Sequence, residues 1–292
     1  MVKLQARALA MAQHMAAQRL ACLRKKRQLS IRMAAAETEI APSTVDRIEQ
    51  GRVTPRASTI EALLTVYGVH DPFQRAYVLE LAAGRREPAW YDQPHVPLPL
   101  AASWHLEDGA EELRTYHVQF IPPLLQTEDY ARAVCAVAST HRSRTCPLEF
   151  GVGLLHQRRQ ILERARPPAY WAIIDESALM RNLGGPTVQS RVLDALIQDV
   201  KSERITLQIA LMDRPIYLPC TGPFTVYRFA QPDRADVVAS HSFAVDRLLG
   251  ETEEVEPHLV AFSAAASYAT KPGRDTLDVL FRHRNALAHR LG

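Results

Sequence analysis

The sequence predicts an α+β protein of two domains, an all-α N-terminal domain and a larger domain that mixes helices and strands. Three observations lead to this fold class. The 292 residues exceed the roughly 100 to 200 of a typical single domain. Charge is segregated, because residues 1–86 hold 14 Lys and Arg against 7 Asp and Glu, whereas residues 87–292 hold 21 against 25. The hydrophobic pattern also changes, from helical spacing at the start to alternating strand-like and helical segments further on.

The composition is that of an ordinary globular protein, with 47% apolar and 23% charged residues. No stretch approaches the roughly 18 to 20 consecutive apolar residues of a membrane span, and the start of the chain lacks the pattern of a secretory signal. We therefore expect a cytoplasmic protein with no membrane partner. The cysteines form no C-x-x-C pair, which indicates reduced thiols rather than disulfides or a zinc site. They are Cys22, Cys135, Cys146 and Cys220.

Five short helices are expected before residue 84. The first segment runs from Leu4 to about Arg27, where apolar residues recur at helical spacing. This basic segment is also compatible with a transit peptide or a membrane-surface helix. Ser30 is the predicted N-cap of a helix from Ile31 to about Thr38. A third helix is expected at Ser43 to Gln50, with Pro42 in its first turn. A fourth is expected to end at Tyr67, with Ser58 as its N-cap, and a fifth to run from Asp71-Pro72 to Ala83.

A stretch with four prolines, residues 85–105, is expected to be a linker or an extended arm, because proline cannot continue a helix interior. It separates the expected helical domain at residues 1–84 from the expected α+β domain at residues 106–292. In this second domain, helices are predicted near residues 125–137, 153–166 and 188–203, and strands at 169–175, 205–212 and 224–229.

The most specific pattern lies between Leu23 and Leu64. Residues 43–52, STVDRIEQGR, followed by Pro55, resemble the recognition helix of an Xre-type helix-turn-helix, the class of the lambda and 434 repressors. The resemblance implies a lambda-repressor-like five-helix domain that binds double-stranded DNA, usually as a homodimer on an inverted-repeat operator. Charge agrees with this reading, because residues 1–36 contain eight basic residues and no acidic one, which suits a polyanion.

The spacing within this helix separates a core face from a DNA face. Val45 and Ile48, three residues apart, can face the core while the rest of the helix faces a groove. Short hydroxyls at a helix N-terminus can meet bases or phosphates, and the fork of Arg47 suits guanine or phosphate. Arginines just past the helix suit phosphates, which position a protein without reading sequence. The candidate DNA contacts are Arg32, Ser43, Thr44, Asp46, Arg47, Arg52 and Arg56.

Three positions depart from the family pattern. Ile31 stands where members usually place a phosphate-binding Gln, and Thr38 and Glu39 occupy positions near the turn that usually hold Leu and Gly. Glu39 lacks the ease of glycine at positive φ and adds a negative charge near DNA. We therefore expect weakened affinity or an unusual partner, with Arg32 as a substitute for the missing polar contact.

The second domain carries its own pattern, in Arg114-Thr115-Tyr116 and in residues 120–133, FIPPLLQTEDYARA. These segments resemble the C-terminal domain of many Xre-type regulators of high-GC Gram-positive bacteria, including WhiJ-like proteins. The resemblance implies a regulatory domain that senses a small-molecule effector or a small protein partner. The candidate contacts to such a ligand or partner are Phe120, Pro122, Leu125, Gln126, Tyr130, Glu176 and Phe224.

The residues themselves also allow a purely structural account of part of this pattern. Thr127 is a plausible N-cap, and Glu128 and Asp129 complement the dipole at the start of a helix. The same helix would then present Tyr130 and Val137 on one apolar face, together with Ala133 and Val134.

The sequence contains no recognisable catalytic motif, metal-binding motif or cofactor motif. Asp175-Glu176 is the nearest to an acid pair, but adjacent strand residues face opposite sides, so a helix cap or an ion pair with Arg158 or Arg159 is expected instead. We expect a transcription regulator that is not an enzyme. The alternatives are a protein-interaction module with secondary DNA contact and, third, an enzyme recruited by the helical domain. The histidines that lack a metal-binding motif are His117, His156 and His241.

Overall fold

The computed structural model describes residues 2–84, 87–139, 148–214, 222–241 and 247–291. The chain forms two compact units, Met1–His105 and Leu106–Gly292. The first is entirely helical and the second combines helices with a six-stranded sheet, so the α+β prediction is confirmed. Within the described ranges, no helix combines the length and the apolar character that a membrane crossing requires.

The predicted N-terminal helices are present. Ser30 caps the second helix by accepting a hydrogen bond from the Met33 N–H at 3.1 Å, and Asp71 caps the fifth by accepting from the Gln74 N–H at 2.8 Å. The predicted cap at Ser58 is wrong, because the strong helix former Ala57 starts this helix and places Ser58 inside its first turn. The helices are α1 (Val2–Lys26), α2 (Ile31–Thr38), α3 (Pro42–Glu49), α4 (Ala57–Val66) and α5 (Pro72–Ala83).

The proline-rich stretch after α5 contains two helical elements, the 3-10 helix η1 (Trp90–Asp92) and the helix α6 (Leu98–Gly109). Pro99 fits α6 because it lies in the first turn, where backbone N–H groups have no helical partner. Arg19 of α1 is only 2% exposed and holds this stretch through its guanidinium. The group donates hydrogen bonds of 2.9 to 3.3 Å to the carbonyls of Tyr91, Asp92, Gln93 and Val96.

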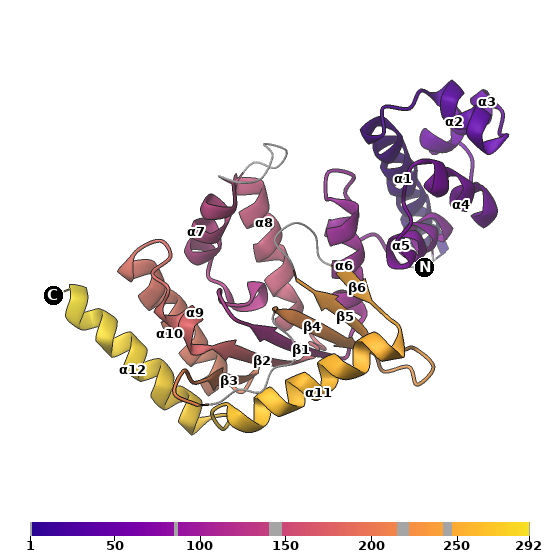
Figure 1. Cartoon of the computed structure of the whole chain (residues 1–292). Helices are drawn as coiled ribbons and strands as arrows, with labels where there is room; N and C mark the ends of the chain where they lie inside the picture. The colour runs from indigo at the N-terminus through magenta and orange to yellow at the C-terminus, as the bar shows by residue number, and fades with distance from the viewer. Residues whose placement is uncertain (1, 85–86, 140–147, 215–221, 242–246, 292) are drawn as a thin grey trace. The chain divides into compact units, whose positions relative to one another are not determined.

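The second unit is built on one mixed sheet with the strand order β3-β2-β1-β4-β5-β6 (Figure 1). The first three strands run parallel to one another, whereas β4 pairs antiparallel with β1 and the remaining strands continue antiparallel. The strands are β1 (Glu112–His117), β2 (Ala169–Asp175), β3 (Thr206–Ala210), β4 (Phe224–Arg228), β5 (Val237–Ser240) and β6 (Arg247–Leu249).

Helices pack on the two faces of the sheet. Helices α7 and α8 lie over one face and α11 runs along the opposite face (Figure 1). On the α11 face, Phe262 packs into an apolar core with Tyr116, Ile173 and Phe224 from the strands. The helical elements are η2 (Pro123–Leu125), α7 (Glu128–Ser139), α8 (Leu148–Arg159), η3 (Gln160–Leu162), α9 (Glu176–Met180), α10 (Pro186–Lys201), α11 (Thr252–Tyr268) and α12 (Arg274–Leu291).

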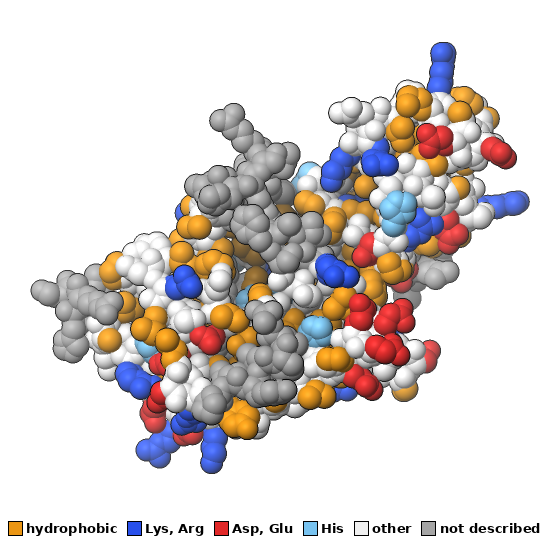
Figure 2. Space-filling model, in the orientation of Figure 1, with side chains coloured by type: hydrophobic (Ala, Val, Ile, Leu, Met, Phe, Trp, Pro, Cys, Tyr) orange, Lys and Arg blue, Asp and Glu red, His pale blue; other side chains and the backbone are white. Residues whose placement is uncertain are grey.

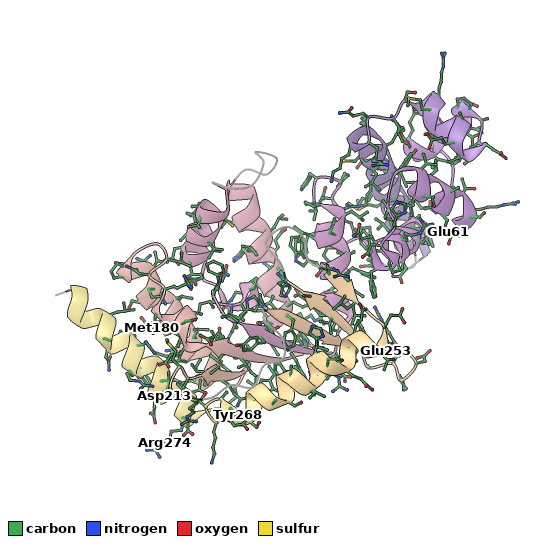
Figure 3. All side chains as sticks on the ribbon, in the orientation of Figure 1. Glu61, Met180, Asp213, Glu253, Tyr268 and Arg274 are labelled. Carbon is green, nitrogen blue, oxygen red and sulfur yellow. The ribbon has the colours of Figure 1, made fainter. Side chains whose placement is uncertain are left out.

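The outer edge of β3 is closed by the turn between α11 and α12, which Tyr268 and Arg274 flank (Figure 3). The Ile209 N–H donates to the hydroxyl of Thr270 and the Thr270 N–H donates to the Ile209 carbonyl, both at 2.9 Å. The Thr276 hydroxyl donates to the Leu207 carbonyl at 2.9 Å. These bonds satisfy strand groups that would otherwise be open to pairing with another chain.

Candidate nucleic-acid interface

Helices α2 and α3 are joined by a tight turn at Glu39. This residue adopts the left-handed conformation, with φ 56° and ψ 24°, as the sequence predicted for the position. Its N–H and that of Ile40 both donate to the Ala35 carbonyl, which ends α2. Pro42 then occupies the first turn of α3, where it starts the helix without losing a backbone hydrogen bond.

Helix α3 has one buried and one exposed face, as predicted. Val45 is fully buried and Ile48 is 2% exposed, so both belong to the core of the unit. Ser43 and Arg47 are exposed, and Thr44 is half-buried. The polar face of α3 is therefore exposed to solvent, as contact with a DNA groove requires.

The next two candidate DNA contacts, Asp46 in α3 and Arg52 in the turn after it, differ in exposure and in hydrogen bonding. Asp46 is half-buried and accepts a hydrogen bond from the Gln50 side-chain amide at 2.8 Å, so it already has a partner one helical turn away. Arg52 is exposed three residues after the end of α3, and its N–H donates to the Arg47 carbonyl at 2.9 Å. This bond holds the backbone of Arg52 against the end of the helix.

Two further exposed arginines lie on the segments that flank α3. Arg32 is in the first turn of α2, and Arg56 immediately precedes α4. Figure 2 shows Lys and Arg side chains projecting from the surface of this unit. The polar face of α3 is thus accompanied by arginines from before and after it in the chain, which is the charge that a phosphate backbone requires.

A buried ion pair that the sequence reading missed fixes the far end of α3. The Arg24 guanidinium of α1 donates to both carboxylate oxygens of Glu49, at 2.8 to 3.0 Å, and the Tyr67 hydroxyl donates to the same carboxylate at 2.7 Å. The hydrogen bond with Glu49 raises the pKa of Arg24, and burial, followed by Glu49, raises that of Tyr67. Glu49 lies four residues after Val45, so helical spacing places it on the buried face of α3. A buried acid needs a partner, and this spacing could have indicated the ion pair.

In the second unit, four of the predicted ligand contacts lie in the connection between β1 and α7, and a fifth, Tyr130, lies in the first turn of α7. Leu125 and Tyr130 are fully buried, Gln126 is 8% exposed, Pro122 is buried and Phe120 is half-buried. The Gln126 amide donates to the Ile121 carbonyl at 2.7 Å, and the Ile121 N–H donates to the Tyr130 hydroxyl at 3.3 Å. These contacts make residues 120–126 a packed turn. The predicted apolar face of α7 is buried at Tyr130 but not at Val137, which is 51% exposed.

The other two predicted contacts lie elsewhere. Phe224 is 1% exposed in the core beneath α11, with its ring centroid 5.0 Å from that of His258. Glu176 begins α9, accepts a hydrogen bond from the Met212 N–H at 3.1 Å and bonds His283 at 2.8 Å. Burial raises the pKa of Glu176, but these hydrogen bonds outweigh burial and leave the pKa below its usual range. The seven candidates therefore do not form one site.

The predicted ion pairs of Asp175-Glu176 with Arg158 or Arg159 are wrong. Arg158 forms a two-pronged, nearly buried pair with Glu107, and Arg159 pairs with Asp199 of α10 at 2.9 Å. Both arginines pair with acidic residues on other helices, and the spacing in the sequence does not indicate these partners. The predicted helix cap is confirmed, because Asp175 accepts a hydrogen bond from the Ser177 N–H at 2.9 Å.

The described part of the chain contains no cluster of three or more His, Cys, Asp or Glu side chains arranged to hold a metal ion. Cys22 is exposed and Cys135 is half-buried, and neither is in a disulfide within the described residues. Cys146 and Cys220 lie outside the described residues.

Comparison with known families agrees with this division of the chain. Residues 16–78, which include α2 and α3, match a helix-turn-helix domain, so the first unit carries a DNA-binding class of fold. Residues 100–282, more than half of the chain, match a domain of unknown function, DUF5753, and the chain belongs to this family. No curated protein and no solved structure matches the chain.

Proposed function

We propose that the protein is a sequence-specific, DNA-binding transcription regulator of the Xre type, and that its DUF5753 domain senses a small ligand or a protein partner in the manner expected of WhiJ-like proteins. The observation that carries the proposal is α3, which buries Val45 and Ile48 and leaves Ser43 and Arg47 exposed within a matched helix-turn-helix domain. In this class the second helix of the motif enters the major groove.

The candidate contacts divide by their chemistry. Ser43, Thr44 and Arg47 lie on the helix that enters the groove and are proposed to reach base edges. Arg52 and Arg56, together with Arg32 of α2, are proposed to contact phosphates. Asp46 is proposed to act in the interface as a partner of Gln50 rather than as an isolated acid, since the two side chains are already bonded.

The assembly follows from the class. A homodimer would place two copies of α3 in successive major grooves, so the operator would be an inverted repeat with half-sites about 34 Å apart. A chain that acts on chromosomal DNA in this way works in the cytoplasm. The DNA-binding domain is proposed for residues 1–84, with the stretch up to residue 105 supporting it through Arg19.

The decisive experiment selects bound fragments from genomic DNA with the full-length protein and then measures affinity by fluorescence anisotropy at several salt concentrations. We expect enriched fragments that share an inverted repeat. Arg47→Ala should reduce the preference for them over random DNA, whereas Arg166→Ala, at an exposed arginine of the second unit, should not.

Failure to enrich any fragment, together with unchanged binding of Arg47→Ala, would overturn the proposal. Strong co-purification with a small protein and absent or salt-insensitive DNA binding would favour a protein-interaction module instead.

A further inference from the structure

Two histidines from distant parts of the sequence lie side by side in the DUF5753 unit. His117 is the last residue of β1, and His241 directly follows β5, where its N–H donates to the Pro223 carbonyl at 2.9 Å. Their ring centroids are 5.4 Å apart and the rings are inclined by 35°. The sheet pairing of β1, β4 and β5 creates this neighbourhood, which no spacing in the sequence could indicate.

The two rings differ in their hydrogen bonds. The Nε2 atom of His241 bonds the Thr225 hydroxyl at 3.0 Å, and Thr225 in turn bonds Thr115 at 3.1 Å. The Nε2 atom of His117, by contrast, is buried and has no partner in the part of the chain that the structure describes. Native proteins leave few buried polar atoms unsatisfied, and each such atom calls for an explanation.

The charge around His117 is positive or neutral. Burial lowers the pKa of His117, and the nearby charges of His241 and Arg158 lower it further. The carboxylate of Glu107 is engaged by Arg158 in a two-pronged pair. Such surroundings repel a metal cation and favour a group that can accept hydrogen bonds and bring negative charge. The titratable groups facing this region are His241 after β5, Arg158 on α8, Glu107 on α6, Tyr170 on β2 and Tyr227 on β4.

The place of His117 in the sheet is also typical of a ligand-binding site. His117 stands at the carboxyl end of a parallel strand, next to β4, where the sheet changes from parallel to antiparallel pairing. Open sheets with parallel strands bind ligands beyond the carboxyl ends of those strands. His117 is half-buried as a residue, while the Nε2 atom of its ring is buried.

We propose that His117, His241 and Thr225 form a binding site for a small oxyanion, a carboxylate or a phosphate group, which accepts hydrogen bonds from the imidazoles. This proposal rests on the proposed function in one respect: it takes the DUF5753 unit to be the sensing domain and assigns a class of ligand to it. An oxyanion favours protonated imidazoles, so binding takes up protons and is tighter at lower pH.

The test uses the full-length protein with ¹³C-labelled histidine rings and follows their NMR signals during titration with inorganic phosphate and, separately, with acetate. The chain has 11 histidines, and the variants His117→Asn and His241→Gln assign the two signals. We expect both signals to shift together and to saturate. Between about pH 7.5 and pH 6.0, the half-saturating concentration should fall by up to about tenfold per pH unit for each proton taken up.

Matched variants separate this site from a general charge effect. Thr225→Val should weaken binding by releasing His241, whereas His156→Gln, at an exposed histidine of α8, should not. Circular dichroism of each variant checks that the unit is folded. A response to phosphate alone or to acetate alone supports the site and identifies the anion.

Two results would overturn the proposal. One is that neither anion shifts the His117 and His241 signals, and the other is that the His156 signal shifts at the same concentrations. Neither measurement involves DNA. A failure of the regulator hypothesis in the DNA-selection experiment is therefore distinguishable from a failure of this site.

Discussion

The buried pair between Arg24 and Glu49 allows a quantitative test of how α3 is held. Glu49→Ala removes three N–O contacts of 2.8 to 3.0 Å with Arg24 and the 2.7 Å bond from Tyr67. The Arg24 side chain is only 11% exposed, so its charge would lose the acid that it is bonded to in a poorly solvated position. Breaking a buried ion pair on one side typically costs about 3–5 kcal/mol.

The expected effect is local, because the two units of the chain need not unfold together. Native-state hydrogen exchange of the full-length protein, read by mass spectrometry on peptides from α3, measures opening of this helix directly. A loss of about 3–5 kcal/mol accelerates exchange by about two to three and a half orders of magnitude, wherever opening of the unit limits exchange. Peptides from β2 should keep their wild-type rates.

Two further variants separate charge from packing. The double variant Arg24→Met with Glu49→Met replaces the pair by apolar side chains and should recover much of the loss, because no buried charge remains. Tyr67→Phe removes one bond to a charged acceptor and should cost about 1.5–3 kcal/mol. Exchange of α3 in Glu49→Ala within about tenfold of wild type would refute the reasoning, as would a double variant that opens as readily as the single one.

Three other predictions concern the remaining features. Arg19→Met removes the bonds that hold residues 91–96, so amides of that stretch should exchange faster, and a fragment ending at residue 84 should unfold more readily than one ending at 105. The lowered pKa of His117 means that the unfolded chain binds its proton first, so the second unit should lose up to about 1.4 kcal/mol per pH unit as pH falls below about 6.5. His117→Asn should make this acid dependence shallower in pH-series denaturation. In anisotropy titrations, Arg52→Ala should reduce the salt slope by about one, whereas Arg47→Ala should cost about 1–3 kcal/mol on the preferred operator and relax its specificity.

Each of these has a result that contradicts it. Unchanged exchange in Arg19→Met would mean that other contacts hold the stretch. Identical pH profiles for wild type and His117→Asn would show that this imidazole does not titrate differently in the two states. An unchanged salt slope in Arg52→Ala would remove that residue from the phosphate contacts.

The sequence predicted those elements whose local pattern agrees with their place in the fold. The strand at residues 169–175 was predicted with its observed bounds, because its apolar run is buried on both faces of the sheet. Strand β1 was not predicted, although it lies at the centre of the sheet. Polar residues of β1 find partners on a neighbouring strand, as when Glu112 pairs with Arg228 of β4 and Thr115 bonds Thr225. Local periodicity therefore could not indicate it.

The same distinction applies to the functional residues. The buried face of α3 follows from helical spacing, so Val45 and Ile48 could be placed from the sequence. The pairing of His117 with His241 depends on strand order, and their separation in the chain concealed it. Leu125 and Tyr130 were predicted as ligand contacts from family resemblance, but both are fully buried, Leu125 in a packed turn and Tyr130 at the start of α7. Resemblance identified a conspicuous segment without showing what its side chains do.

The atypical turn between α2 and α3 can be understood from the bonds on either side of it. Glu39 adopts a left-handed conformation that costs about 1 kcal/mol more than it would for glycine. The Thr38 hydroxyl, one residue earlier, donates to the Ala34 carbonyl at 2.7 Å within the last turn of α2. At the far end of α3, Glu49 is fixed by Arg24, so the position of α3 does not depend on the strained residue alone. Any loss of DNA affinity should therefore come from the Glu39 charge and from the apolar side chain at position 31, and not from a displaced recognition helix.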